Sequence, residues 1–389
     1  MSSDRSFLAF VMLFAATWLV AFPGFAQTKH VRLDEPASLS PDYNYANPQM
    51  PDHIRALDFL DNTPAENPVT DEGAHLGRVL FHDRQLSKNG LVSCASCHTA
   101  AIGFDDQTRF SIGFSGQITR RAAMPLANAR FNPRGRYFWD ERAPTLEDQV
   151  LDPLTDPIEM GLMPKQAISR ISSRPWYPPL FEAAFGDNEV TDQRIAAALA
   201  QFVRTLISQS SPYDKAKASA GPDTSATEPF PEFNPTENRG KFLFFADRSQ
   251  GGVGCSSCHE TDAFVMLRPR NNGLPPSDRE IDNGLGEITG ETADNRLFRA
   301  ASLKNIEKTA PYMHDGRFAS LDEVIEHYSG KIEPHPNLSA ELRNPDGSPI
   351  RLNLDDQDKA ALIAFLNSLT DEEMMADERF SDPFILTTN

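Results

Sequence analysis

Long apolar runs, basic residues and strand-like alternation are all in short supply in this chain. After Ala26 no segment approaches the ~20 consecutive apolar residues that span a bilayer. Lys and Arg number 37 against 55 Asp and Glu, and the resulting charge of −18 disfavours nucleic acid and anionic lipid as partners. Because alternation is scarce, we expect a mainly α-helical fold, and 30 Pro with 22 Gly imply long loops.

Cysteine is scarce as well, and its placement is informative. The four cysteines all lie in two copies of one pattern, Cys94-Ala-Ser-Cys97-His98 and Cys255-Ser-Ser-Cys258-His259. This is the pattern of a c-type haem attachment site, in which both thiols add to the porphyrin and the histidine binds the iron. A redox dithiol does not need the histidine, and a zinc site made of four cysteines would leave both histidines unexplained. The doubled motif therefore predicts two covalently bound haem c groups, with His98 and His259 as iron ligands.

The first residues are typical of a cleaved export signal. Arg5 precedes an apolar run from Phe7 to Phe22, and Gly24-Phe25-Ala26 has the small-x-small form of a cleavage site. A membrane anchor is the alternative, although the run is short for a span. Since haem c is attached outside the cytoplasmic membrane in bacteria, we expect residues 1–26 to be a signal peptide and the mature protein to be periplasmic.

The two halves of the chain repeat the same motifs in the same order. Gly77-Arg78-Val-Leu80-Phe81, before the first haem motif, matches Gly240-Lys241-Phe-Leu243-Phe244, before the second. Further on, Trp139-Asp140-Glu-Arg142 matches His314-Asp315-Gly-Arg317. Chance could supply any one of these matches, but their common order indicates an internal duplication.

The repeat predicts two cytochrome c-like haem domains, residues 50–214 and 236–376. Residues 215–235 are rich in Pro, Ser, Ala and Gly and have no apolar period, as expected of a linker. Residues 27–49 look like an extended arm, and residues 377–389 form a tail. Helices are predicted after a capping Thr191, from a capping box at Ser320 through Tyr328, and from Asp355 to Leu369.

The far side of each haem decides its function, because a haem with an open sixth position can bind peroxide or oxygen. Pro153 and Tyr328 fall at matching positions of the repeat. Proline has no side-chain donor atom and would leave the first iron open, whereas the tyrosine oxygen could close the second. Met313 is the main alternative ligand of the second iron, and Met266 is another.

Two further residues are candidates for the chemistry. Glu159 lies 6 residues after Pro153, where a buried carboxyl could move a proton between the two oxygens of peroxide. By spacing alone, a solvated surface acid is the simpler interpretation. Trp139 could relay an electron or a hole between two metals, and a core tryptophan is the alternative.

These residues resemble the bacterial di-haem cytochrome c peroxidase family, and within it the MauG-like branch, from about Gly73 to Leu369. The paired haem motifs, Phe138-Trp139-Asp140 and the Pro-Tyr-Met-His-Asp-Gly segment at 311–316 carry the likeness. It implies a peroxidatic, high-spin first haem and a low-spin, six-coordinate second haem. By the same likeness, Trp139 matches the residue that couples the haems, and Glu159 matches the acid–base carboxylate. Gln149 and Pro153 match residues on the distal side of the first haem. Tyr328 matches the axial ligand of the second haem, which is Met in the peroxidases and Tyr in MauG.

The resemblance also points to differences from the family pattern. Standard peroxidases close the first haem at rest with a loop histidine, but no histidine occurs between Thr99 and Trp139, which implies a haem that is open without reductive activation. The tryptophan that MauG carries before the second motif is Val253 here, which argues against MauG's own substrate reaction. The family's calcium would be held by the backbone carbonyls of Thr309 and Pro311, but the asparagine expected just before Pro125 is missing.

Together these features predict a periplasmic di-haem peroxidase. It would reduce hydrogen peroxide at the first haem with electrons that a small cytochrome c or cupredoxin delivers through the second. A MauG-like enzyme that uses peroxide to oxidise side chains of a partner protein is the alternative. A di-haem electron carrier without turnover is a second alternative. The family includes monomers and homodimers, and either is expected here.

Overall fold

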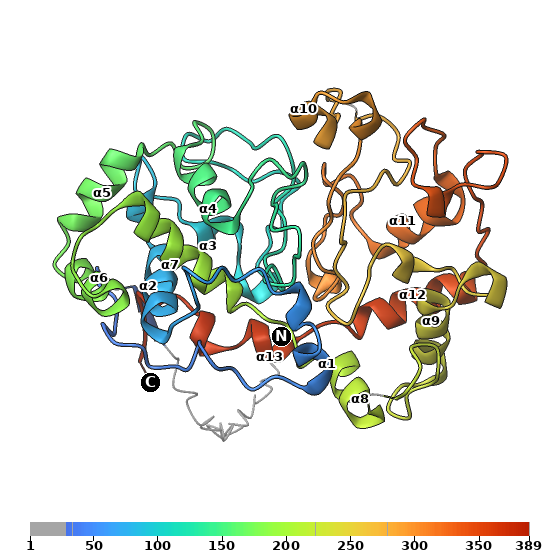
Figure 1. Ribbon diagram of the computed structural model, residues 1–389, viewed down its shortest axis with the longest axis horizontal. Coiled ribbons are helices and arrows are strands. Elements are labelled where there is room, and N and C mark those ends of the chain that lie inside the picture. Colours follow the sequence, from blue (N-terminus) through green and yellow to red (C-terminus); the bar gives the residue numbers. More distant parts are fainter. Residues whose placement is uncertain (1–28, 33, 222, 278, 389) are drawn as a thin grey trace, which may run out of the picture.

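The computed structural model describes residues 29–32, 34–221, 223–277 and 279–388. The expected signal peptide, residues 1–26, lies outside the described residues. No helix in the described part of the chain is long and apolar enough to cross a membrane. Two mostly helical halves lie side by side, with the blue-to-green segment in one and the yellow-to-orange segment in the other (Figure 1). The mainly α-helical, two-haem-domain fold expected from the sequence is therefore confirmed.

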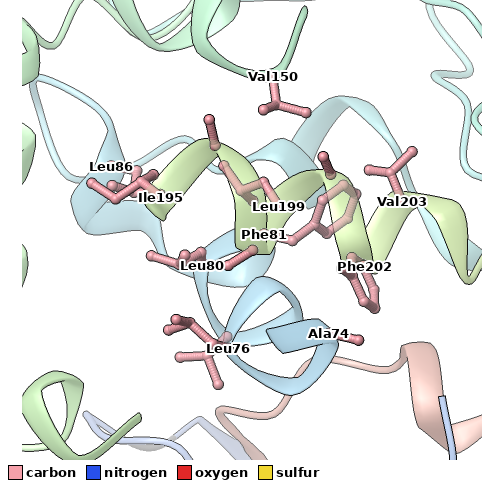
Figure 2. Close-up of a cluster of buried hydrophobic side chains, with 14 of the residues drawn as sticks. Ala74, Leu76, Leu80, Phe81, Leu86, Val150, Ile195, Leu199, Phe202 and Val203 are labelled. Carbon is pink, nitrogen blue, oxygen red and sulfur yellow. The ribbon is translucent and has the colours of Figure 1, made fainter. Parts of the chain in front are cut away.

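The first half is built on the crossing of α2 (Asp71–His82) and α7 (Asp192–Arg204). Leu80 and Phe81 of α2 face Leu199 and Phe202 of α7 in one buried cluster, which Val150 joins from above (Figure 2). The remaining helices around this cluster are α3 (Cys94–Cys97), α4 (Leu146–Thr155), α5 (Pro164–Ser172) and α6 (Tyr177–Phe185).

The second half repeats this construction with α9 (Pro235–Phe245) and α12 (Asp356–Asn367). Its core is aromatic: the Phe244 ring lies 5.1 Å from that of Phe365, and the Tyr213 ring lies 5.0 Å from that of Phe264. The helices that complete this half are α8 (Pro212–Ala220), α10 (Leu285–Thr289) and α11 (Leu321–Glu326), and α1 (Asp52–Arg55) packs against α8.

Several segments between these helices are single turns. Short 3₁₀ turns cover Asp58–Leu60, Arg84–Leu86, Ala100–Ile102, Arg248–Gln250, Cys255–Ser257, Thr292–Asp294, Ile306–Lys308, Ala340–Leu342 and Glu378–Phe380.

A glycine lies at the helix crossing in each half. A β-carbon on Gly77 would lie 2.0 Å from the carbonyl oxygen of Ala198, and one on Gly240 would lie 1.9 Å from that of Ala361. The spacing from glycine to alanine along the chain is the same in both halves. The two helix pairs therefore approach equally closely, and the sequence repeat is also a structural repeat.

The predicted helix starts are found where capping residues stand. Thr191 accepts a hydrogen bond from the backbone N–H of Arg194, and Asp355 accepts one from that of Asp358. Ser320 caps α11, but the α-helix ends at Glu326 instead of continuing through Tyr328. Its last residues form a π-helical turn, His327–Lys331. Such turns are frequent at functional sites because the extra residue re-aims a side chain.

The chain does not end in the half where its last long helix lies. After α12 it passes back under the first half through α13 (Glu372–Met375), where Met374, Phe380 and Phe384 join the first core (Figure 1). Strand β2 (Ile385–Thr388) then pairs antiparallel with β1 (Lys29–Arg32). The arm and the tail, predicted as separate extensions, thus close on each other beside the first half.

The predicted linker, residues 215–235, is more ordered than its composition suggests. It begins inside α8, and Phe230 and Phe233 are buried in the second core. Lys241 donates hydrogen bonds from its ammonium group to the carbonyl oxygens of Ala226 and Glu228. The connection therefore packs along the second half.

The glycine crossings give a test of the fold. Gly240→Ala adds a methyl group that clashes with the backbone of Ala361, so α9 and α12 must separate. We expect the free energy of unfolding to fall by about 1–3 kcal/mol, the usual cost of overpacking, as measured by denaturant titration of the holoprotein. Gly330→Ala is the matched control, because nothing lies within 4 Å of a β-carbon there. Equal stability of the two variants would contradict close packing at the crossing.

Candidate functional site

The first cavity gathers residues that the sequence places far apart. Its wall includes the motif residues Cys94, Cys97 and His98, which α3 and its C-terminal end supply. Further along the chain, α4 and the loop after it complete the wall, and the residues they bring to it are Gln149, Val150, Pro153, Glu159 and Met160. The three motif residues and the three predicted distal residues of the first haem, Gln149, Pro153 and Glu159, thus line one space.

The His98 ring is held in a defined orientation. Its Nδ1 lies 3.0 Å from the carbonyl oxygen of Phe104, so Nδ1–H donates there and Nε2 keeps its lone pair. Burial lowers the pKa of His98 and favours the neutral ring. A neutral imidazole with a free Nε2 is the form that binds iron.

The four thiols fit haem attachment better than thiol chemistry. None of them is in a disulfide. Burial raises the pKa of Cys94 to about 12 and that of Cys97 to about 11, and it raises the pKa of Cys255 to about 12. Redox dithiols have depressed pKa values, so these groups lack the environment of a reactive thiol. Together with buried neutral histidines and apolar walls, this donor set fits two haem c groups.

Helix α4 presents two distal residues on one face. Gln149 and Pro153 are separated by four positions, which places them one turn apart on the same side of the helix. Pro153 lacks a backbone N–H, so the helix cannot make its usual bond to the Gln149 carbonyl there. Neither residue offers the first iron a strong ligand.

Glu159 has an unusual carboxyl group. It lines the first cavity, and burial raises its pKa to about 7, with the nearby charge of Asp156 adding to the effect. Arg142 opposes the rise. A carboxyl that titrates near neutrality can both accept and return a proton, which is the property that acid–base chemistry requires.

The loop before Trp139 covers the Glu159 segment. Phe114 donates its backbone N–H to the carbonyl oxygen of Glu159 at 2.8 Å. A β-carbon on Gly113 would lie 1.6 Å from the carbonyl oxygen of Ile158, so only glycine allows this approach. The loop lines the first cavity with Ser111, Gly113 and Thr119, where the standard peroxidases would carry a histidine.

The second cavity has the same proximal wall. Cys255, Cys258 and His259 line it, and burial lowers the pKa of His259 to about 4, so the ring is neutral. Unlike the ring of His98, this ring has no acceptor for Nδ1 among the described residues. The two proximal histidines are therefore supported differently.

Two of the three candidate ligands of the second haem, Tyr328 and Met313, lie together in the wall of this cavity. The side-chain amide of Asn272 lies 3.3 Å from the Tyr328 hydroxyl oxygen and 3.5 Å from the Met313 sulfur. Burial raises the pKa of Tyr328 to about 12. Met266 lines the same cavity. All three candidates that the sequence offers therefore line this cavity, and Tyr328 and Met313 both lie beside the amide of Asn272.

The backbone that carries Asn272 is itself fixed. His327, which begins the π-helical turn, has its Nε2 3.0 Å from the carbonyl oxygen of Asn272. The residue that precedes Tyr328 thus anchors the loop whose amide contacts the Tyr328 hydroxyl. This arrangement was not recognisable from the sequence, because Asn272 lies in a loop without a motif.

Trp139 stands between the two cavities. It contributes to the wall of the second cavity and to the wall of the adjoining space that reaches His98 and Glu159. Its indole N–H donates to the carbonyl oxygen of Ala122 at 2.9 Å. The ring meets that of His314 edge to face at 6.4 Å, and the sequence repeat places His314 where Trp139 stands in the first half.

Ion pairs join the halves beside Trp139. Arg121 bonds to Asp282 at 2.8 Å and also pairs with Asp140, the residue after Trp139. Arg120 bonds to Glu280 at 2.7 Å and also pairs with Glu287. Because the side chains of Arg121 and Asp282 are each only 8% exposed, this contact is largely shielded from solvent and fixes the junction.

The expected calcium ligands lie close to the second cavity. Thr309 and Pro311 both line it, and so does the buried Asp105. The described residues contain no group of three or more His, Cys, Asp or Glu side chains arranged to hold a metal ion. Calcium binding stays a prediction. Val253, at the position of MauG's tryptophan, also lines the second cavity.

A scan against family models matches residues 71–221 to di-haem cytochrome c peroxidase. MauG, the methylamine utilization protein of Methylorubrum extorquens, is 34% identical over 310 residues, 79% of this chain and 81% of the relative. The cytochrome c551 peroxidase of Nitrosomonas europaea is 33% identical over 311 residues, 79% of this chain and 83% of that enzyme. Among solved structures, a MauG-like protein associated with microbial copper homeostasis has a TM-score of 0.69 and 34% identity, covering 88% of this chain and 98% of its own.

Glu159 gives the first test of the site. Its carboxyl should ionise with a midpoint near pH 7 instead of near 4.5, and should therefore be mostly protonated below that pH and ionised above it. The measurement is the infrared carboxyl band of the holoprotein against pH, identified by its loss in Glu159→Gln. Asp156→Asn keeps the hydrogen-bond acceptor but removes a nearby negative charge, so the midpoint should fall. A midpoint near 4.5 in the unaltered protein would contradict the burial of this carboxyl.

Proposed function

The chain belongs to the di-haem cytochrome c peroxidase family, and we propose that it reduces hydrogen peroxide at the first cavity with electrons delivered through the second. The observation that carries this proposal is the asymmetry of the two distal walls. The first offers Gln149, Pro153 and a carboxyl with a pKa near 7, and the second offers Tyr328 and Met313. A carrier of electrons alone has no use for the acid at the first wall.

The residues that would hold the two haem c groups are the two motifs. Cys94 and Cys97 would attach the first, with His98 as its iron ligand. Cys255 and Cys258 would attach the second, with His259 as its iron ligand. When bound, the haems supply the site that takes up peroxide and the two electrons that convert it, with two protons, into two molecules of water.

Glu159 handles the proton. As a carboxylate it takes the proton from the peroxide oxygen nearer to the first haem, and it returns that proton to the leaving oxygen, which departs as water. The raised pKa suits both steps, because neither form of the group is strongly favoured at neutral pH. Gln149, on the same wall, offers an amide that can orient the substrate.

Trp139 carries charge between the halves. Trp139 lines the second cavity and also the space that adjoins the first cavity, so its aromatic ring lies in the protein that would separate the two haems. The bonds from its indole N–H to Ala122 and the contact with His314 hold it in one orientation. Fixed geometry matters because electron transfer depends steeply on the distance and contact between groups.

Tyr328 is the proposed second ligand of the second iron. A phenolate stabilises oxidised iron more than a thioether does, so tyrosine there would support a site that stores oxidising equivalents. Burial opposes an isolated phenolate, and the iron would supply the positive charge that offsets this. The amide of Asn272 donates a further hydrogen bond to the oxygen.

A MauG-like role is the second candidate. In it the oxidising equivalents are filled from side chains of a partner protein instead of a small cytochrome or cupredoxin. Tyr328, the absence of a loop histidine and the identity to MauG and to the copper-homeostasis relative favour it. Val253 stands where MauG has its charge-transfer tryptophan, so charge would have to reach a partner protein through a different contact.

We further propose that the protein is exported to the periplasm and that it is a monomer or a homodimer. Thr309 and Pro311 are the proposed calcium ligands.

The second-haem ligand is tested by exchange. Tyr328→Met should raise the midpoint potential of the second haem, because a thioether favours the reduced iron, and should alter the low-spin component of the ferric EPR spectrum. Met313→Leu, the matched control, should change neither. A low-spin spectrum that changes only in Met313→Leu would make Met313 the ligand. Two low-spin signals in the unaltered protein that persist through reduction would instead indicate an electron carrier.

The proton role of Glu159 is tested by stopped-flow mixing with peroxide. Glu159→Gln should slow the reaction by about 10²–10⁴-fold, the usual contribution of a positioned acid–base group, with both haems still attached. In the unaltered protein the rate should fall as the pH is lowered through about 7, since only the ionised carboxyl accepts a proton. That pH dependence should be missing in Glu159→Gln. Glu182→Gln, an exposed change on α6, is the control. Unchanged peroxide kinetics in Glu159→Gln would remove Glu159 from the mechanism.

A further inference from the structure

One buried arginine has a guanidinium nitrogen for which the described residues offer no hydrogen-bond acceptor. Arg299 is 6% exposed, and its Nε has no hydrogen-bond acceptor among the described residues. No carboxylate in the described chain lies within salt-bridge distance of its guanidinium. The other two buried arginines are satisfied: Arg78 bonds to Ser381, and Arg204 bonds to Glu147 at 2.6 Å.

The carboxylate whose charge acts on Arg299 is already engaged by another arginine. Glu141 contributes a favourable charge to Arg299, but its carboxylate is bonded to Arg134 at 2.7 Å. Burial lowers the pKa of Arg299, yet a guanidinium stays protonated in proteins. A buried charge without a partner costs several kcal/mol. A group that persists in such a place therefore points to an anion that is not part of the polypeptide.

The location of Arg299 narrows the choice of anion. The residue lines the second cavity, with Cys255, His259 and Tyr328, and also the adjoining space that reaches His98 and Glu159. Its backbone N–H donates to the carbonyl oxygen of Trp139 at 2.8 Å. The ring of Tyr137 lies below the guanidinium at 5.8 Å. Arg299 thus lines the second haem cavity and the space that adjoins the first, and its backbone is bonded to Trp139.

We propose that the Arg299 guanidinium binds a haem propionate and so ties the edge of that haem to Trp139. A planar guanidinium matches a carboxylate with two parallel hydrogen bonds, which a single ammonium cannot make. Propionates are the anionic groups that haem c brings to such a cavity. Arg270, the other arginine of the second cavity, also has an Nε without an acceptor among the described residues, but its guanidinium is already paired with Glu341 at 3.0 Å. The inference requires two bound haems and does not depend on peroxide turnover.

Binding of this kind has an electrostatic consequence. The positive charge of Arg299 offsets the propionate and stabilises the reduced form of the nearby iron, which carries one positive charge less. Removal of that charge should lower the midpoint potential of the haem concerned. It should also raise the pKa of the propionate, so that the potential of that haem becomes more dependent on pH near neutrality.

The test compares Arg299→Gln, Arg299→Lys and the unaltered holoprotein by spectroelectrochemistry and resonance Raman spectroscopy. Arg299→Gln should lower one midpoint potential and shift the propionate bending band of the same haem, and Arg299→Lys should restore much of the potential but not the band. Arg239→Gln is the control, because it removes the same charge from an exposed pair with Asp358 on the surface of the second half. It should leave the potentials and the band unchanged.

The outcomes assign the propionate or reject it. A shift confined to the second haem supports binding of its propionate, and a shift confined to the first haem supports binding of that one. Unchanged potentials and propionate bands in Arg299→Gln, with both haems attached, would overturn the proposal. If Arg299→Gln does not mature, Arg299→Lys decides: it should still shift the propionate band, and an unchanged band in that variant would equally overturn it.

Discussion

The close crossing of one helix pair in each half is the constraint on which the rest of the structure depends. Gly77 and Gly240 let α2 and α9 lie directly on the backbones of Ala198 and Ala361. Each first helix leads straight to a haem motif, so the crossing sets where the cysteines and the proximal histidine meet the cavity. Because the crossing is the same twice, both cavities receive the same motif residues, and apart from the hydrogen bond that only the His98 ring makes, the larger differences lie at the other walls.

Different local structures form the other wall of each cavity. In the first half, a proline in α4 and the carboxyl of Glu159 leave the side chains of the distal wall without a strong iron ligand. In the second, a π-helical turn carries Tyr328 to the cavity, and His327 fixes the loop that holds Asn272 against it. A regular α-helix through Tyr328 would turn this side chain differently. The asymmetry between the two cavities therefore rests on a few residues within otherwise equivalent folds.

The sequence was informative where a residue acts alone or within a short pattern. Thr191 and Asp355 cap helices because their own side chains accept the first backbone N–H groups, and this needs no tertiary context. Pro153 and Tyr328 were found by position because the duplication preserves register. Arg299 and Asn272 could not be predicted from the sequence. Arg299 is distinctive because its Nε has no acceptor among the described residues, and Asn272 because it contacts both Met313 and Tyr328. The return of the chain end to the first core was likewise invisible, since Met374, Phe380 and Phe384 gain meaning only from distant neighbours.

That return bears directly on charge transfer. The segment after α12 leaves the second half and packs into the first, while Arg121 joins Asp140 to Asp282 across the junction. Two haem domains on a flexible linker would let the distance between their cavities vary. Here the chain crosses the junction twice and ion pairs hold it beside Trp139. The proposed relay through Trp139 requires that fixed separation, so in that proposal the residues that tie the halves together matter as much as those that line the cavities.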